Sequence, residues 1–194
     1  MIDDLDSDRS DSSHPDGHEA DSVADLGRSF DDFYRRAYSD IVRTLSFTLT
    51  DAVLGAEAAD EAMARTYARW DQVRHYDNPA GWTYRVGLNW ARSTHRRLAR
   101  QLPFVGRATA IEPTFRDPAV AEALRSLDID LRAVVVCRLL ADWSVAETAA
   151  ALDLNPGTVK SRLHRALTQL ERKLEAPDHL RLHRTATNQN GTLS

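Results

Sequence analysis

The sequence predicts an all-α protein of two small helical domains joined by a flexible linker, with a helix-turn-helix in the C-terminal domain. Apolar residues recur at helical spacing from residue 29 to residue 174, without a strand pattern or an internal repeat. A stretch broken by prolines and a glycine, from 102 to 118, separates two helical groups. We expect a disordered acidic tail at 1–27, a first domain at 28–100, a linker at 101–117, a second domain at 118–175 and a mobile tail at 176–194.

The composition predicts a soluble, cytoplasmic protein. No stretch of the 194 residues approaches the roughly 18 uninterrupted apolar residues that a membrane span needs. The acidic N-terminus also lacks the basic start and apolar run of a secretion signal. The single cysteine, Cys137, lies in the run "AVVVCRLL", which favours a buried structural thiol.

The charge is distributed unevenly along the chain. The formal net charge is −4, yet residues 1–25 alone carry nine acidic side chains and one basic one, so the remainder is mildly basic. No acid occurs from Asn78 to Ile111, where six arginines lie, or from Leu154 to Leu170. Two separate basic stretches indicate two contacts with a polyanion.

Two helices are expected in the first part of the first domain. One begins at Ser29, a suitable N-cap, and carries regularly spaced apolar residues as far as Leu49. The next runs from about Leu54 to Trp70 and turns Tyr67 and Trp70 inward. Its outward face carries three acids and one base, namely Glu57, Asp60, Glu61 and Arg65. Because charged helix faces are usually only solvated, the residues alone give this face no specific role.

A third helix begins at "DNPAGW", where Asn78 is the cap and Pro79 occupies the first turn, and continues to about Arg100. Trp82 and Trp90 belong to an apolar stripe along it, and a second stripe beside it consists of Arg85, Asn89, Arg92 and Arg96. This pattern suits an unwound nucleic-acid strand, because bases stack on aromatic rings while guanidinium groups follow phosphates. The alternative is that the tryptophans are core residues and the arginines merely solubilise the helix.

The stretch "SVAETAAALDLNPGTVKSRLHRAL" predicts the helix-turn-helix. Ser144 and Glu147 form a capping-box pattern, Asp153 supplies the turn, and Asn155 caps the second helix. That helix is expected to bury Val159, Leu163, Ala166, Leu170 and Leu174. It leaves outside Thr158, Lys160, Ser161, Arg162, His164 and Arg165. Such side chains bond base edges and phosphates in the DNA major groove, so we predict DNA contact here over a plain solvated face.

Other chemistries find no support in the sequence. It contains no glycine-rich phosphate loop, no His-Glu-x-x-His motif, no cysteine pair and no nucleophile elbow. Two histidine pairs, His14 with His18 and His179 with His183, lie in the tails without a third ligand. We therefore expect no catalytic residue, no metal, no cofactor and no small-molecule substrate.

Taken in order, these segments resemble an extracytoplasmic-function (ECF) sigma factor, the smallest type of bacterial RNA polymerase sigma subunit. The resemblance covers roughly residues 29–175. "FDDFYRRAYSDIVRTLSF" is similar to the start of sigma region two, and "GAEAADEAMARTYARWDQV" to its polymerase-binding helix. "NPAGWTYRVGLNWARSTHRR" is similar to the helix that meets the promoter −10 element. The helix-turn-helix stretch is similar to region four, which binds the −35 element.

The resemblance implies a protein that binds core RNA polymerase and directs promoter recognition and transcription initiation. The partners it implies are the largest-subunit clamp and the flap of the polymerase, promoter DNA and, as a further candidate, an anti-sigma factor. The clamp contact would fall to Glu57, Asp60, Glu61 and Arg65, although the family usually has other residues at the first two positions. A flipped −10 base would be received by the loop residues Gln72, Arg74, His75 and Tyr76, and Trp82 is a further candidate for contact with the −10 element.

Two further function classes remain as alternatives. A free-standing helix-turn-helix regulator would bind an operator without polymerase and use its N-terminal domain to dimerise. An enzyme acting on nucleic acid is disfavoured, because the sequence has no recognisable catalytic constellation. Mixing the protein with core polymerase distinguishes the first alternative from a sigma factor.

Overall fold

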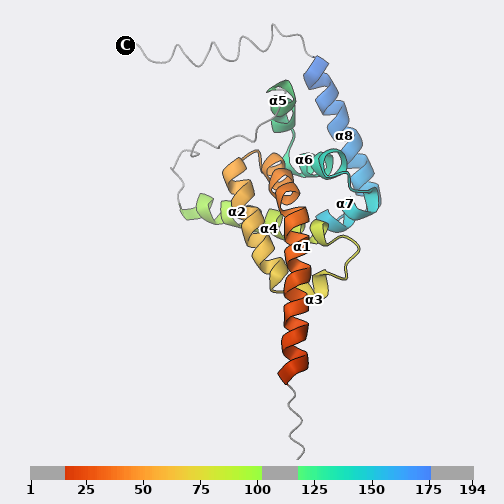
Figure 1. The fold of residues 1–194 in the computed structure, drawn as a ribbon. Coiled ribbons are helices and arrows are strands. Elements are labelled where there is room, and N and C mark those ends of the chain that lie inside the picture. Colours follow the sequence, from red (N-terminus) through yellow and green to blue (C-terminus); the bar gives the residue numbers. More distant parts are fainter. Residues whose placement is uncertain (1–15, 102–117, 176–194) are drawn as a thin grey trace, which may run out of the picture.

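The computed structural model describes residues 16–101 and 118–175, and within these ranges every regular element is helical (Figure 1), as predicted. The first range holds α1 (Asp16–Leu49), α2 (Ala52–Tyr67), the short α3 (Trp70–Val73) and α4 (Pro79–Gln101). The second holds α5 (Pro118–Ser126), α6 (Ile129–Val135), the π-helical turn η1 (Val136–Leu140), α7 (Val145–Leu152) and α8 (Pro156–Glu175).

Glycines allow the helices of the first domain to approach one another closely. After a short turn, the carboxylate of Asp51 caps α2 and starts it back along α1. A Cβ added at Gly55 of α2 would lie 2.5 Å from the Cα of Ser46 on α1. A Cβ added at Gly87 of α4 would lie 2.8 Å from the carbonyl oxygen of Ala58 on α2. These contacts require residues without a side chain.

The core of this domain lies where α1, α2 and α4 meet. Its apolar members include Ile41 and Leu45 from α1, Ala58 and Met63 from α2, and Tyr84, Leu88 and Ala91 from α4. Two hydroxyl pairs are buried with them. The oxygens of Thr48 and Tyr84 are 2.9 Å apart, and those of Thr66 and Thr83 are 3.0 Å apart. Because these hydroxyls pair with one another, the core carries no cost of leaving them unsatisfied.

The helix-turn-helix consists of α7 and α8. Ser144 accepts a hydrogen bond from the backbone N–H of Glu147, and the Glu147 carboxylate accepts one from the backbone N–H of Ser144, which lowers the pKa of Glu147. Asp153 ends α7 with a left-handed φ of 55°, which Asp tolerates better than most residues. Asn155 caps α8 by accepting from the backbone N–H of Thr158 at 2.8 Å. The predicted capping box, turn residue and second cap are all confirmed.

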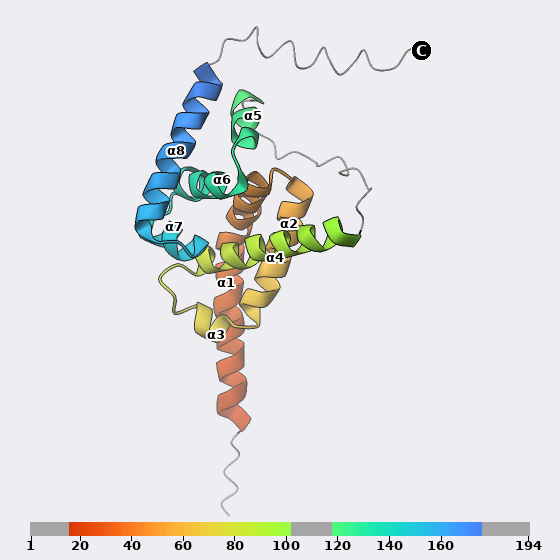
Figure 2. The same ribbon diagram turned by 180° about the vertical axis from the view of Figure 1, so that it is seen from behind.

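The second domain packs directly on the first (Figure 2). Ala133, Cys137 and Ala151 join the core described above, and the Trp143 ring meets the Tyr84 ring edge-on, with centroids 5.5 Å apart. Cys137 is buried, as predicted, and its burial raises the pKa of the thiol to about 12. The two domains therefore share a continuous apolar core.

A buried arginine joins the two domains through backbone carbonyls. Arg132 is 8% exposed. Its guanidinium donates to the carbonyl oxygens of Leu124 and Leu127, at 2.9 and 2.6 Å, where α5 ends. It also donates to the carbonyl oxygen of Thr48 at 2.9 Å, where α1 ends. Arg132 thus ties the corner between α5 and α6 to the end of α1.

The first helix is longer than predicted. It begins at Asp16 rather than at Ser29, so the expected disorder up to residue 27 is wrong for residues 16–27. Ser29 serves instead as the acceptor for the indole N–H of Trp70, at 3.3 Å. Once the packed part of a helix has formed, each further residue is added at little cost. Residues 1–15 lie outside the described residues.

Two residues predicted to be buried are exposed. Tyr67 is 60% exposed, because α2 ends there. Trp70, at the start of α3, is buried in the core instead. Leu174 is 44% exposed in the last turn of α8, beyond Ala166 and Leu170, which pack into the second domain. The predicted linker, apart from its first residue, and the predicted C-terminal tail lie outside the described residues.

Gly55→Ala should destabilise the protein by about 1–3 kcal/mol, because the new methyl group forces α1 and α2 apart. Urea unfolding followed by circular dichroism measures the change. Gly157→Ala is the matched control, since its Cβ would meet only the Asn155 side chain at 3.3 Å. It should change stability by no more than about 1 kcal/mol. Equal stabilities for the two variants would contradict the close packing at Gly55.

Candidate nucleic-acid interface

The predicted arginine and asparagine stripe lies on the outer face of α4. The helix start is held by Asn78, whose side-chain oxygen accepts from the backbone N–H of Gly81 at 2.7 Å. The inner face is held by the buried side chains of Tyr84 and Leu88, so the stripe cannot turn inward. Its members are Asn89 and Arg96, which are exposed, and Arg85 and Arg92, which are half-buried.

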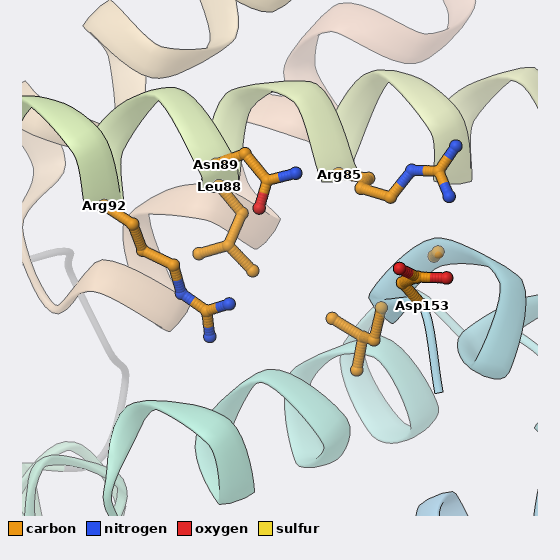
Figure 3. Close-up of a pocket in the computed structure, with 7 residues that line it drawn as sticks. Arg85, Leu88, Asn89, Arg92 and Asp153 are labelled. Atoms are coloured by element: carbon orange, nitrogen blue, oxygen red, sulfur yellow. The ribbon is translucent and has the colours of Figure 1, made fainter. Parts of the chain in front are cut away.

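Part of this stripe faces the second domain. Arg92 forms an ion pair with Asp130 of α6 at 2.6 Å, and Arg85 donates to the carbonyl oxygen of Ala150 in α7 at 3.4 Å. A pocket of about 400 Å³ lies between α4 and the end of α7. Figure 3 shows Arg85, Asn89 and Arg92 on one side of it and Asp153 on the other. Arg85 and Arg92 of the stripe therefore face the second domain, whereas Arg96 is exposed.

The second helix of the helix-turn-helix, α8, presents its predicted polar face. Val159 and Ala166 are buried beneath it, while Lys160, Ser161, His164 and Arg165 are exposed. The hydroxyl of Thr158 donates to the side-chain oxygen of Asn155 at 3.0 Å, and that of Ser161 donates to the Thr158 carbonyl at 3.1 Å. Arg162 is the exception on this face, because it lies 3.8 Å from the carboxylate of Asp130.

The loop between α3 and α4 brings an aromatic pair to the surface. Tyr76 is exposed, and its ring centroid lies 6.4 Å from that of the half-buried Trp82. Gln72 in α3 and His75 in the loop are also exposed, and Arg74 forms an ion pair with Asp71 at 3.5 Å. Trp82 and Trp90 both pack partly against the core, so each tryptophan has a structural role. The half-buried ring of Trp82 in addition lies next to Tyr76 of the loop.

The predicted polymerase-binding face lies on α2. Glu57 and Asp60 are exposed, and Glu61 pairs with Arg65 at 2.8 Å. Tyr38 of α1, which the sequence did not single out, donates its hydroxyl to Asp60 at 2.7 Å. This hydrogen bond, together with burial, raises the pKa of Tyr38 to about 12. The face therefore extends from α2 onto α1.

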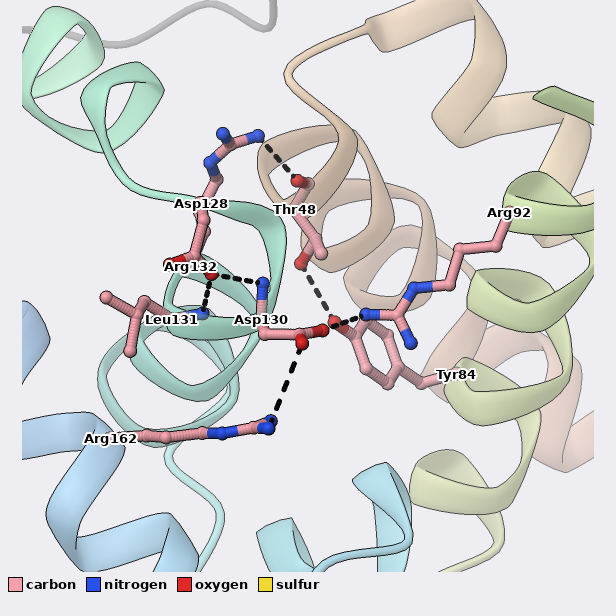
Figure 4. A network of polar contacts seen from close by, with 8 residues as sticks. All are labelled: Thr48, Tyr84, Arg92, Asp128, Asp130, Leu131, Arg132 and Arg162. Atoms are coloured by element: carbon pink, nitrogen blue, oxygen red, sulfur yellow. Dashed lines mark hydrogen bonds and ion pairs between the residues drawn. The ribbon is translucent and has the colours of Figure 1, made fainter. Parts of the chain in front are cut away.

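Asp130 is the residue that sequence reasoning missed at this interface. Its carboxylate pairs with Arg92 from one predicted DNA-binding surface and with Arg162 from the other (Figure 4). In the sequence it follows the cap residue Asp128 by two positions, where an acid is typical of a helix start. The local pattern therefore explains an acid at this position but does not reveal its distant partners.

Neither a cluster of metal-ligating side chains nor a membrane-spanning helix is found in the part of the chain that the structure describes. No group of three histidine, cysteine or acidic side chains there is arranged to hold a metal ion. None of the helices in residues 16–101 and 118–175 is long and apolar enough to cross a membrane. His14, His179 and His183, from the two histidine pairs of the tails, lie outside these ranges.

Comparisons with known proteins relate the chain to sigma factors. The family model "Sigma-70, region 4" matches residues 118–170. RNA polymerase sigma-E factor of Streptomyces coelicolor is 33% identical over 155 residues, which cover 77% of this chain and 88% of that protein. ECF RNA polymerase sigma factor SigM of Mycobacterium tuberculosis is 29% identical over 154 residues, which cover 75% and 77% respectively.

Two solved structures have a similar fold. One is the sigma factor RpoE in complex with the anti-sigma factor NepR from Bartonella quintana, with a TM-score of 0.68 and 18% identity over 77% of this chain and 98% of that one. The other is CnrH in complex with the cytosolic domain of CnrY, with a TM-score of 0.57 and 22% identity over 81% and 94%. At these identities the likeness establishes the fold alone.

The region-four match falls on the helices whose caps and turn were described above. The relationship to the Streptomyces coelicolor protein extends over both domains and most of the length of each chain. The chain belongs to the ECF family of RNA polymerase sigma factors.

Proposed function

We propose that this sigma factor binds core RNA polymerase through α2, places α8 on the duplex −35 element, and places α4 with its preceding loop on the opened −10 element. One observation carries the proposal: two basic surfaces lie on different domains, and α2, which carries the exposed acids, lies on the other side of α1 from α8 (Figures 1 and 2). A protein that meets one polymerase and two stretches of DNA needs three such surfaces. Its role is that of an initiation factor without catalysis of its own, in the cytoplasm.

The proposal assigns reading of the −35 element to one face of α8. Thr158, Ser161, Arg162 and Arg165 follow each other at spacings of three, one and three residues, so they lie on a common face. Near the start of a recognition helix, such side chains reach base edges. His164 is exposed beside this face, and Lys160 is exposed further around the helix, where its ammonium group can meet phosphate.

The proposal assigns the opened −10 strand to α4. From Arg85 to Arg96 the stripe rises about 16 Å along the helix, which allows contact with several nucleotides. The rings of Tyr76 and Trp82 lie near the start of the helix, where an unstacked base has an aromatic surface to stack on. Guanidinium groups then follow the phosphates of the same strand.

The partners follow from these surfaces. Core polymerase binds the face formed by Glu57, Asp60, Glu61 and Arg65, and Tyr38 holds the Asp60 carboxylate in place. Promoter DNA binds the faces of α4 and α8. Because the RpoE structure is a complex with an anti-sigma factor, we include such a protein among the proposed partners.

Size-exclusion chromatography of the chain with core polymerase tests the proposed function. We expect co-elution, and transcripts with discrete 5′ ends on genomic DNA only when both components are present. Asp60→Lys should weaken assembly about tenfold, because it reverses an exposed charge and removes the acceptor of Tyr38. Asp40→Lys is the matched control, since Asp40 is exposed and lies about 200° around α1 from Tyr38. Tight operator binding without co-elution would favour a free-standing regulator instead.

Arg165→Ala should reduce discrimination between a cognate −35 element and a mutated one by about 1–3 kcal/mol, because the exposed guanidinium reads a base. Run-off transcription by the reconstituted holoenzyme on paired templates measures this difference. The control is Arg172→Ala, which removes an exposed arginine from the last turns of the same helix and should leave selectivity unchanged. Unaltered selectivity in the Arg165 variant would exclude base reading by this side chain.

Arg96→Ala should impair promoter opening more than duplex capture, because the proposed contact of Arg96 is the unwound strand. Permanganate reactivity of −10 thymines reports opening, and a mobility shift of holoenzyme on duplex DNA reports capture. Arg97→Ala removes the neighbouring exposed arginine, which lies outside the stripe, and serves as the control. Equal permanganate reactivity in the two variants would argue against the stripe.

A further inference from the structure

The pocket between α4 and the end of α7 has the size of a small-molecule site. Its volume of about 400 Å³ lies within the range of roughly 300–1,000 Å³ that is typical of ligand pockets. Polar side chains line two sides of it, with Arg85, Asn89 and Arg92 on α4 and Asp153 at the end of α7 (Figure 3). A hollow with a few convergent polar groups is the usual form of a ligand site.

The rest of the lining is apolar. Leu88 and Ala151 are each 2% exposed, and Leu152 is half-buried. Such a surface accepts a flat ring or the carbon face of a sugar, because it gains from being covered and asks for no hydrogen bond. A ligand that fits this pocket therefore has polar groups at its ends and a less polar part between them.

One end of the pocket holds a cation and an acid together. Arg85 donates to the carbonyl oxygen of Ala150 at 3.4 Å, which places its guanidinium at the end of α7. Figure 3 shows the Asp153 carboxylate facing this side chain across the pocket. A guanidinium has five N–H donors, so the contact with Ala150 leaves most of them available. The ionised carboxylate can only accept hydrogen bonds.

These two side chains match the hydrogen-bonding edges of guanine. A carboxylate accepts from the N1–H and the 2-amino group, which lie side by side on one edge of the base. An arginine donates to O6 and N7 on the neighbouring edge. Adenine offers a donor beside an acceptor where guanine has its two donors, so it cannot satisfy a carboxylate in the same way. Asp153 and Arg85 together therefore favour guanine over adenine.

The other end of the pocket suits a phosphate. Arg92 follows Arg85 by seven residues on α4, which is about 10 Å along the helix, and Asn89 lies on the same stripe between them. Arginine pairs with phosphate through two N–H groups, and the Asn89 amide adds a further donor. Asp130 lies 2.6 Å from Arg92 but also 3.8 Å from Arg162, so two cations face one acid here. The charge that a ligand phosphate meets at this end is positive.

We infer that this pocket binds a free guanine mononucleotide, with the base held by Asp153 and Arg85, the phosphate by Arg92 and Asn89, and the sugar against the apolar lining. The inference goes beyond the proposed function, which gives Asp153 no ligand. The three α4 residues also belong to the stripe proposed for the −10 strand, so the nucleotide and that strand exclude one another there. This last consequence alone rests on the proposed function.

Equilibrium dialysis of the full chain against a series of ligands tests the assignment. The probes are guanosine monophosphate (GMP), adenosine monophosphate (AMP) and guanosine. GMP should bind about tenfold more tightly than AMP, because adenine leaves the carboxylate without its second donor. It should also bind about tenfold more tightly than guanosine, which lacks the phosphate. Equal binding of GMP and AMP, or no binding of GMP at millimolar concentration, overturns the inference.

Asp153→Asn is the decisive variant, because the amide presents a donor where guanine needs two acceptors. Asn accepts the left-handed φ of 55° at this position. The matched control is Asp142→Asn, since Asp142 is exposed, has a left-handed φ of 52° and is not part of the pocket lining. The Asp153 variant should lose its preference for GMP over AMP, and the control should keep it. A preference retained in the Asp153 variant contradicts the inference.

The phosphate end has its own pair of variants. Arg92→Gln should abolish the advantage of GMP over guanosine, because it removes the guanidinium that meets the phosphate. Arg97→Gln is the control, since Arg97 is an exposed arginine of the same helix outside the pocket. An advantage that survives in the Arg92 variant places the phosphate elsewhere and overturns the arrangement. The ligand series on the unmodified chain decides the question by itself if a variant does not fold.

A guanine within a DNA strand carries the same base and phosphate as the free nucleotide. Two single strands therefore complete the series, a thymidine pentamer and the same pentamer with one central guanosine. Because a pocket of about 400 Å³ holds one nucleotide without its neighbours, the two strands should bind equally. Tighter binding of the guanosine-containing strand without binding of GMP assigns the pocket to DNA and overturns the inference.

Failure of this inference and failure of the proposed function are distinguishable. If GMP does not bind, co-elution with core polymerase and promoter-dependent transcription by the unmodified chain still support the proposed function. If GMP binds with the expected preferences while the chain neither co-elutes nor directs transcription, the nucleotide site stands and the proposed function is contradicted.

Discussion

The buried guanidinium of Arg132 is the contact on which the arrangement of the helices depends. Its donors must find acceptors away from water, and they do so at backbone carbonyl groups where α5 and α1 end. The hydroxyl of Thr48 pairs in turn with Tyr84, so one series of hydrogen bonds joins α6, α1 and α4. Burial lowers the pKa of Arg132, yet an arginine remains charged in proteins. Moving α5, α6 or α1 would leave a buried charge without its partners, which is costly.

This constraint places an acid among basic groups. The stretches that contain Arg92 and Arg162 have no acid of their own, so their counter-charge comes from Asp130. Asp130 precedes Arg132 by two residues on α6. Because Arg132 holds α6 against the end of α1, Asp130 comes within reach of both α4 and α8. The carboxylate of Asp130 therefore offsets part of the positive charge that these two stretches bring together.

Local chemistry was readable from the sequence. The capping box of Ser144, the left-handed turn at Asp153 and the caps Asn78 and Asn155 each depend on a few neighbouring residues, and the structure has all of them. Helical periodicity also identified the exposed charged faces of α2, α4 and α8. The predicted burial failed at Tyr67, because α2 ends there. The predicted start of the first helix failed, because the helix continues back to Asp16.

The sequence by itself determined the class of fold, the helix-turn-helix and the residues that form each charged surface, because these properties follow from spacing and from contacts within a few residues. Only the tertiary structure decided how those surfaces face one another. The distant partners of Asp130 and Arg132, namely Arg92, Arg162 and Thr48, lie between 32 and 84 positions away in the chain, and no local pattern specifies such pairs. Their meeting depends on a shared core and on the need of a buried charge for acceptors, and both arise only when the whole chain has folded.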